Sequence, residues 1–115
     1  MKKSIILLIS ILSLLLLASC TSKSSDSLAS CLSEKNVKFY GAFWCPHCQN
    51  QKNEFGSSVN LLPYIECSNS DRSQNQVCKD ANIQSYPTWE FPDGTRLTGE
   101  QTLETLAQKS GCSIE

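Results

Sequence analysis

Histidine is nearly absent from this sequence, and closely spaced cysteine pairs are scarce. His47 is the only histidine, and Cys45 and Cys48 are the only two cysteines separated by two residues. A structural zinc site needs four ligands, which usually come as two such close pairs. We therefore expect neither a bound metal nor any other cofactor.

An excess of charge of either sign is also lacking. The chain has 10 lysines and arginines against 11 acidic residues, with no basic patch and no acidic tail. Proteins that bind nucleic acid carry a concentrated positive surface. A nucleic-acid partner is therefore not expected. The sequence shows no internal repeat and no segment for dimerisation, so we expect a monomer.

Only one long apolar run is present, and it lies at the start of the chain. The basic residues of Met1–Lys3 precede an almost wholly apolar stretch over residues 4–17. This stretch has the length of a signal-peptide core and is short for a membrane span. It ends in Leu17–Cys20, which resembles the bacterial lipoprotein signal, in which Cys20 becomes the acylated first residue. The alternatives are an ordinary signal peptide cut near Ala18 or Ser19 and an uncleaved anchor.

This start divides the chain into three parts. We expect a signal peptide over residues 1–19, an acylated cysteine with a flexible serine-rich tether over 20–30, and one domain over 31–115. Lipid on Cys20 would hold the protein on a membrane. The predicted location is therefore the extracytoplasmic (periplasmic) face of a bacterial membrane.

Cysteine itself is abundant, with seven residues in 115. Such a density is typical of proteins from oxidising compartments. If Cys20 is acylated and Cys45 pairs with Cys48, four cysteines remain and allow three connectivities. These four are Cys31, Cys67, Cys78 and Cys112. The sequence does not choose among the connectivities, although a Cys67–Cys78 bond would close a short polar loop. Free buried thiols are the alternative.

Cys45 and Cys48 follow an apolar run that predicts a buried strand over residues 37–43. Pro46 suits the first turn of a helix, so Cys45 is expected where the free N–H groups and the helix dipole favour a thiolate. His47 adds a second positive group. Cys48 would then attack a mixed disulfide on Cys45 and close the ring. A plain structural disulfide is the alternative, but it is awkward within one helical turn.

The remaining chain predicts a β-α-β-α-β-β-α order, preceded by a short helix over residues 28–35. The expected strands cover 37–43, 61–66, 83–91 and 95–98, and the expected helices cover 46–55, 72–81 and 100–110. This order, with the two cysteines opening the first of these three helices, resembles the thioredoxin fold. The resemblance implies an α/β domain with a mixed four-stranded sheet flanked by helices. The helix over 46–55 is unusually polar, so its support is expected mainly from its ends.

Tyr86-Pro87-Thr88 strengthens this resemblance. In the thioredoxin fold, a cis-proline in the loop before the third strand faces the cysteine pair, and Pro87 stands at that place. A cis bond is accessible to proline at a cost of about 0.5–1 kcal/mol. It would expose the backbone of Tyr86 beside Cys45 for an extended substrate. The alternative is a trans proline that only begins a strand.

The resemblance narrows to one branch, the thioredoxin-like domain that bacteria fuse to, or make beside, homologues of vitamin K epoxide reductase (VKOR). It covers nearly all of residues 31–114, and the residues that carry it are Phe39–Cys48, Gln51-Lys52, Phe55-Gly56, Tyr64–Cys67, Tyr86–Trp89, Leu106-Ala107 and Ser110-Gly111. It implies an extracytoplasmic enzyme that takes electrons from the thiols of secreted proteins and passes them to a membrane quinone reductase. Here that VKOR-like partner is expected to be a separate protein. The resemblance also implies a structural Cys67–Cys78 pair.

The predicted roles follow. The expected catalytic residues are Cys45, Cys48, His47, Pro46 and Pro87, and the expected substrate contacts are Trp44, Tyr86, Pro87 and Thr88. One departure concerns the buried acid that thioredoxins carry six residues before the first cysteine, because Phe39 occupies that position. Glu66 is the candidate to replace it, with an exposed strand glutamate as the alternative.

Three other functions stay open. The first is a membrane-tethered reductase, which runs the same exchange backwards. The second is a metal-handling module in which Cys45, His47 and Cys48 carry copper(I) or zinc. The third is a non-catalytic binding domain, which the intact cysteine pair disfavours.

Overall fold

The structure, a computed structural model, describes residues 23–114. The predicted signal peptide and Cys20 lie outside these residues. Within the described range, no helix has both the length and the apolar character needed to cross a membrane.

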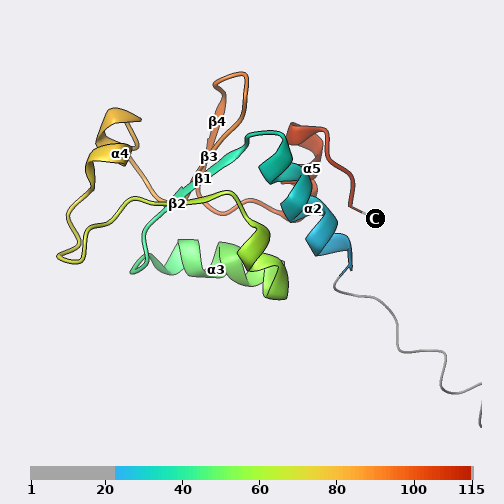
Figure 1. The fold of residues 1–115 in the computed structure, drawn as a ribbon, viewed down its shortest axis with the longest axis horizontal. Coiled ribbons are helices and arrows are strands. Elements are labelled where there is room, and N and C mark those ends of the chain that lie inside the picture. The colour runs from blue at the N-terminus through green and yellow to red at the C-terminus, as the bar shows by residue number, and fades with distance from the viewer. Residues whose placement is uncertain (1–22, 115) are drawn as a thin grey trace, which may run out of the picture.

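A mixed four-stranded sheet forms the centre of the fold (Figure 1). Its strands are β1 (Lys38–Gly41), β2 (Tyr64–Glu66), β3 (Thr88–Glu90) and β4 (Arg96–Thr98), in the order β2-β1-β3-β4. β1 is parallel to β2 and antiparallel to β3, and β3 is antiparallel to β4. The predicted fold class is confirmed, with strands shorter than expected.

Four α-helices and one 3-10 helix complete the described part of the fold. They are α2 (Lys23–Glu34), α3 (Pro46–Phe55), the 3-10 helix η2 (Gly56–Leu61), α4 (Gln76–Asp80) and α5 (Leu103–Ser110). In Figure 1, α3 runs below the sheet, α2 and α5 pack together on the right, and α4 lies on the far left. Cys45 and Cys48, the predicted reactive pair, lie at the start of α3.

The predicted tether over residues 20–30 is wrong from Lys23 onward, because α2 begins there. Leu28 and Leu32 are one helical turn apart, and both are completely buried in the core. This spacing gives α2 an apolar face that the serine-rich composition conceals. Asp26, in the first turn, also accepts a hydrogen bond from Ser58 of η2. Residues 23–30 are therefore part of the domain.

Aromatic stacking fixes the centre of the core. The rings of Phe39 on β1 and Trp89 on β3 are stacked at 4.4 Å, and both side chains are fully buried. Phe39 thus fills with apolar surface the place where thioredoxins carry an acid.

A buried glutamine connects α3 to this core. Gln51 is completely buried, and its Oε1 accepts from Trp89 Nε1 at 3.2 Å and from the Gln101 backbone N–H at 2.7 Å. Its Nε2 donates to the Gln101 carbonyl at 3.0 Å. The expectation that α3 is supported mainly at its ends is therefore wrong, because a polar residue in its middle provides three hydrogen bonds.

Two disulfides tie distant parts of the fold. Cys31 of α2 is bonded to Cys112, which follows α5, and Cys67, which follows β2, is bonded to Cys78 of α4. The structure thus selects one of the three connectivities that the sequence leaves open. Among the described cysteines, only Cys45 and Cys48 are free.

Candidate active site

Cys45 is the N-cap residue of α3. Its extended backbone, with φ −79° and ψ 117°, turns its side chain back over the first turn of the helix. The backbone N–H of Cys48 donates to Cys45 Sγ at 3.3 Å. A free N–H group at a helix start stabilises negative charge on an acceptor. Cys45 thus places its sulfur at the start of α3, where it accepts a helix N–H and stands before the more deeply buried Cys48.

Cys48 lies deeper than Cys45, which is itself buried but keeps 5% of its surface exposed. It is completely buried, and this burial is the main reason why its pKa rises to about 12. The hydrogen bond and charge interaction with Cys45 also raise the pKa, while the Ala42 backbone and Lys52 lower it. Cys48 therefore keeps its proton at neutral pH, and the two sulfurs have different chemical roles.

Gly41 packs tightly against Cys48 and the Tyr64 ring. A Cβ added at Gly41 would lie 2.9 Å from Tyr64 Cε2 and 3.1 Å from Cys48 Sγ. Both distances are shorter than the ordinary contacts of a Cβ atom, so only glycine fits there without a shift. Lys52, one helical turn after Cys48, places its Nζ 3.6 Å from the centre of the Tyr64 ring. The back of the site is thus an aromatic ring covered by an ammonium group.

The loop before β3 supplies the other wall. The Tyr86–Pro87 peptide bond is cis, the form that the thioredoxin resemblance implies. The Cys45 thiol donates to the Tyr86 carbonyl oxygen at 3.8 Å, so this loop faces the reactive sulfur. A carbonyl at this place is available to a chain lying across Cys45.

The four predicted substrate contacts divide into two kinds. Trp44 and Tyr86 are partly exposed, and their rings meet edge to face at 6.0 Å. Pro87 and Thr88 are buried. Since the Thr88 hydroxyl donates to the Ser85 carbonyl at 2.7 Å, it holds the loop instead of facing solvent. Of these four predicted contacts, the two that solvent reaches are therefore the aromatic ones.

His47 is exposed, and its imidazole contacts a carboxylate. Its Nδ1 lies 2.9 Å from Glu100 Oε2, on the segment before α5. An exposed pair of this kind contributes about 0–1 kcal/mol. The effect of His47 on Cys45 stays a prediction, and Glu100 is a neighbour that sequence reasoning missed.

Glu66 is more engaged than an exposed strand residue. Its Oε2 accepts from the backbone N–H groups of Phe43 at 3.2 Å and Ser68 at 3.0 Å, and its Oε1 accepts from the Tyr64 hydroxyl at 3.2 Å. Burial and the nearby Glu66 carboxylate raise the pKa of Tyr64 above its usual value. Glu66 thus joins the loop that leads to Cys45 to the end of β2.

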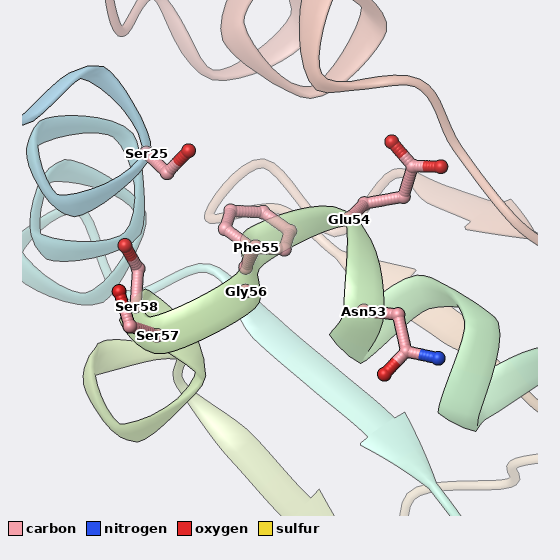
Figure 2. A pocket seen from close by; sticks show the side chains of 7 residues that line it. All are labelled: Ser25, Asn53, Glu54, Phe55, Gly56, Ser57 and Ser58. Carbon is pink, nitrogen blue, oxygen red and sulfur yellow. The ribbon is translucent and has the colours of Figure 1, made fainter. Parts of the chain in front are cut away.

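One hollow lies where α3 passes into η2 (Figure 2). Its volume is ≈ 270 Å³, and it is lined by Ser25, Asn53, Glu54, Phe55, Gly56, Ser57 and Ser58. It lies at the end of α3 opposite to Cys45 and includes none of the predicted site residues. Among residues 23–114, no three histidine, cysteine or acidic side chains gather as metal ligands.

Comparison with known proteins agrees with this geometry. The Thioredoxin family profile matches residues 22–110. The chain is 36% identical over 104 residues to "Thiol-disulfide oxidoreductase LTO1" of Arabidopsis thaliana, across 86% of this chain and 27% of that protein. It thus spans about a quarter of that relative. The structure is also similar to the crystal structure of oxidized glutaredoxin 2 from Chlamydomonas reinhardtii, with a TM-score of 0.42 and 22% sequence identity. This match covers 80% of this chain and 97% of the glutaredoxin chain. By the family match, this chain belongs to the thioredoxin family.

Proposed function

We propose that this thiol–disulfide oxidoreductase oxidises the thiols of secreted proteins at the extracytoplasmic face of a bacterial membrane. The observation that carries the proposal is the asymmetry of the free pair. Cys45 caps α3 and accepts an N–H at 3.3 Å, while Cys48 is completely buried with a raised pKa. Stabilising the thiolate of a reduced pair makes its disulfide a better oxidant. The Pro46-His47 dipeptide resembles that of strongly oxidising enzymes.

The reaction begins with a disulfide between Cys45 and Cys48. A substrate thiolate attacks Cys45 Sγ, forms a mixed disulfide, and displaces Cys48 as a thiolate that takes up a proton. A second substrate thiolate then attacks the substrate sulfur of the mixed disulfide and releases Cys45 as a thiolate. The substrate loses two electrons as its disulfide forms, and the enzyme pair gains them.

The electrons then leave through a membrane protein. We propose a separate quinone reductase similar to VKOR, on the strength of the resemblance carried by Phe39–Cys48 and Tyr86–Trp89. Lipid on Cys20 would keep the enzyme beside this partner. In a bacterial host, Cys20→Ser should move the protein from the membrane fraction to the soluble extracytoplasmic fraction. Retention of the variant in the membrane would contradict lipid anchoring at this residue.

Trapping on Cys45 tests the direction of electron flow. Cys48→Ala leaves Cys45 able to form mixed disulfides that nothing within the enzyme resolves. Purification of the covalent adducts should yield secreted proteins and a quinone-linked membrane protein, and the double variant Cys45→Ala/Cys48→Ala is the control. A membrane electron donor with already folded clients would instead identify a reductase. If Cys45→Ala oxidises thiols as fast as wild type, the proposed function is wrong.

A further inference from the structure

The loop that the Cys67–Cys78 disulfide closes lies directly beside the candidate site. Residues 67–78, here called the bridging segment, leave the end of β2 and return through α4. Within it, Ser68 and Gln74 face each other as an isolated antiparallel β-bridge. The Asn75 N–H donates to the Cys67 carbonyl at 2.7 Å, so the base of the segment is held by backbone bonding as well as by the disulfide.

Both bridge residues form hydrogen bonds to the two aromatic side chains beside Cys45, Trp44 and Tyr86, here called the aromatic walls. Trp44 Nε1 donates to Ser68 Oγ at 2.9 Å. Gln74 Nε2 donates to the Tyr86 hydroxyl at 2.9 Å and to the Ile83 carbonyl at 2.8 Å. Each wall beside Cys45 is therefore bound, through its polar tip, to one half of the same bridge.

These contacts form a closed ring. Trp44 bonds to Ser68, Ser68 pairs with Gln74, Gln74 bonds to Tyr86, and the Tyr86 ring meets the Trp44 ring at 6.0 Å and 80°. A side connection strengthens it, because Glu66 Oε2 accepts from both the Ser68 and Phe43 N–H groups. In such a ring, moving either aromatic side chain disturbs its hydrogen bond to the bridge and its contact with the other aromatic ring.

We propose that Ser68 and Gln74 are positioning residues that hold Trp44 and Tyr86 for protein substrates. This inference rests on the proposed function. Neither residue touches the reacting sulfurs; each acts through an aromatic wall. The occupant that fits is an extended peptide with an apolar side chain next to its cysteine, since Trp44 and Tyr86 flank Cys45 and Phe43 is 47% exposed. Aromatic side chains bury large areas when they bind such a chain.

The reacting sulfurs contact this arrangement at the Tyr86 backbone carbonyl, in a loop that the Thr88–Ser85 hydrogen bond also holds. A small dithiol such as dithiothreitol reaches Cys45 without spanning both walls, so its reaction does not need them to be held. A protein substrate loses binding energy when the walls move. The positioning role thus predicts a loss for protein substrates alone, whereas general destabilisation would slow both reactions.

The experiment compares two reductants of the oxidised enzyme in single-turnover kinetics, namely reduced, unfolded ribonuclease A and dithiothreitol. Ser68→Ala and Gln74→Met should each lower the second-order rate constant for the protein by about five-fold, the effect of losing one neutral hydrogen bond. Ser68→Thr, which keeps the hydroxyl, should restore the rate. The second-order rate constant for dithiothreitol should stay within about two-fold of wild type, and so should the equilibrium constant for reduction of the enzyme by glutathione.

Matched controls come from the same segment. Ser70→Ala and Gln76→Met change exposed residues, and Gln76 bonds only to Asp80 of its own helix. They should leave both rates unchanged. Equal losses with both reductants, or no loss beyond these controls, would overturn the positioning role while leaving the proposed function intact. A wild-type enzyme that reacts with dithiothreitol but not with the reduced protein would overturn the proposed function as well.

Discussion

Replacing Gln51 by methionine should destabilise this domain strongly, although the change conserves side-chain size. Gln51 is completely buried and satisfies three polar groups, namely Trp89 Nε1 and the N–H and carbonyl of Gln101. Methionine replaces none of these hydrogen bonds. The buried Trp89 N–H then has no partner, which costs about 1–3 kcal/mol. Since Gln101 is only half-buried, water can reach it in part, and we expect about 2–5 kcal/mol in total.

Urea unfolding of the oxidised protein measures this cost. With a slope of about 2 kcal/mol/M, the middle of the usual range, the urea midpoint should fall by about 1–2.5 M. Gln108→Met is the matched control, because Gln108 is exposed on α5 and such changes stay within about 0.5 kcal/mol. A Gln51→Met variant that unfolds at the same urea concentration as Gln108→Met would refute the argument that this glutamine supports α3.

Three further changes test other parts of the fold. Gly41→Ala places a Cβ 2.9 Å from Tyr64 Cε2 and 3.1 Å from Cys48 Sγ. It should lower the free energy of unfolding by about 1–3 kcal/mol and slow the formation of the Cys45–Cys48 disulfide by glutathione disulfide. An unchanged rate of disulfide formation would contradict the crowding. The pKa of Cys48 is raised to about 12 in the folded protein and is about 8.5 in the unfolded chain. The folded state therefore gains stability from the protonated Cys48 thiol that is complete below about pH 8.5 and is lost as pH rises toward 12. The unfolding free energy of the reduced protein should therefore fall more steeply between about pH 8.5 and 10.5 than that of Cys48→Ala, and equal slopes would contradict this. The double change Cys31→Ser/Cys112→Ser opens a bond across 81 residues and should cost about 2–4 kcal/mol in urea unfolding while leaving the dithiothreitol rate unchanged; a large rate loss would contradict a purely structural bond.

Features set by neighbouring residues could be predicted from the sequence. The predicted helix 46–55 has the bounds of α3 because Cys45 caps it, Pro46 fits its first turn, and Gly56 follows its last residue with a positive φ of 54°. Each of these signals is local.

The features that could not be predicted depend on residues far away in the sequence. Gln51 looks like a solvated residue until Trp89, 38 positions away, and Gln101, 50 positions away, are brought to it. Leu28 and Leu32 make α2 a helix because the packed core buries their side chains completely. The helix predicted over residues 28–35 therefore begins five residues earlier, at Lys23, since no local signal in the serine-rich residues before Leu28 reports what they will pack against.

The same division separates the chemistry of the site from the arrangement of its walls. The position of Cys45 at the start of α3 depends on residues next to it. The position of the walls depends on contacts between Trp44 and Ser68, 24 residues apart, and between Gln74 and Tyr86, 12 residues apart. On the proposed positioning role, changes in the bridging segment should alter which protein substrates fit while Cys45 keeps its place at the start of α3. A family that keeps its cysteine pair constant while this segment varies would change its substrates and preserve its reaction.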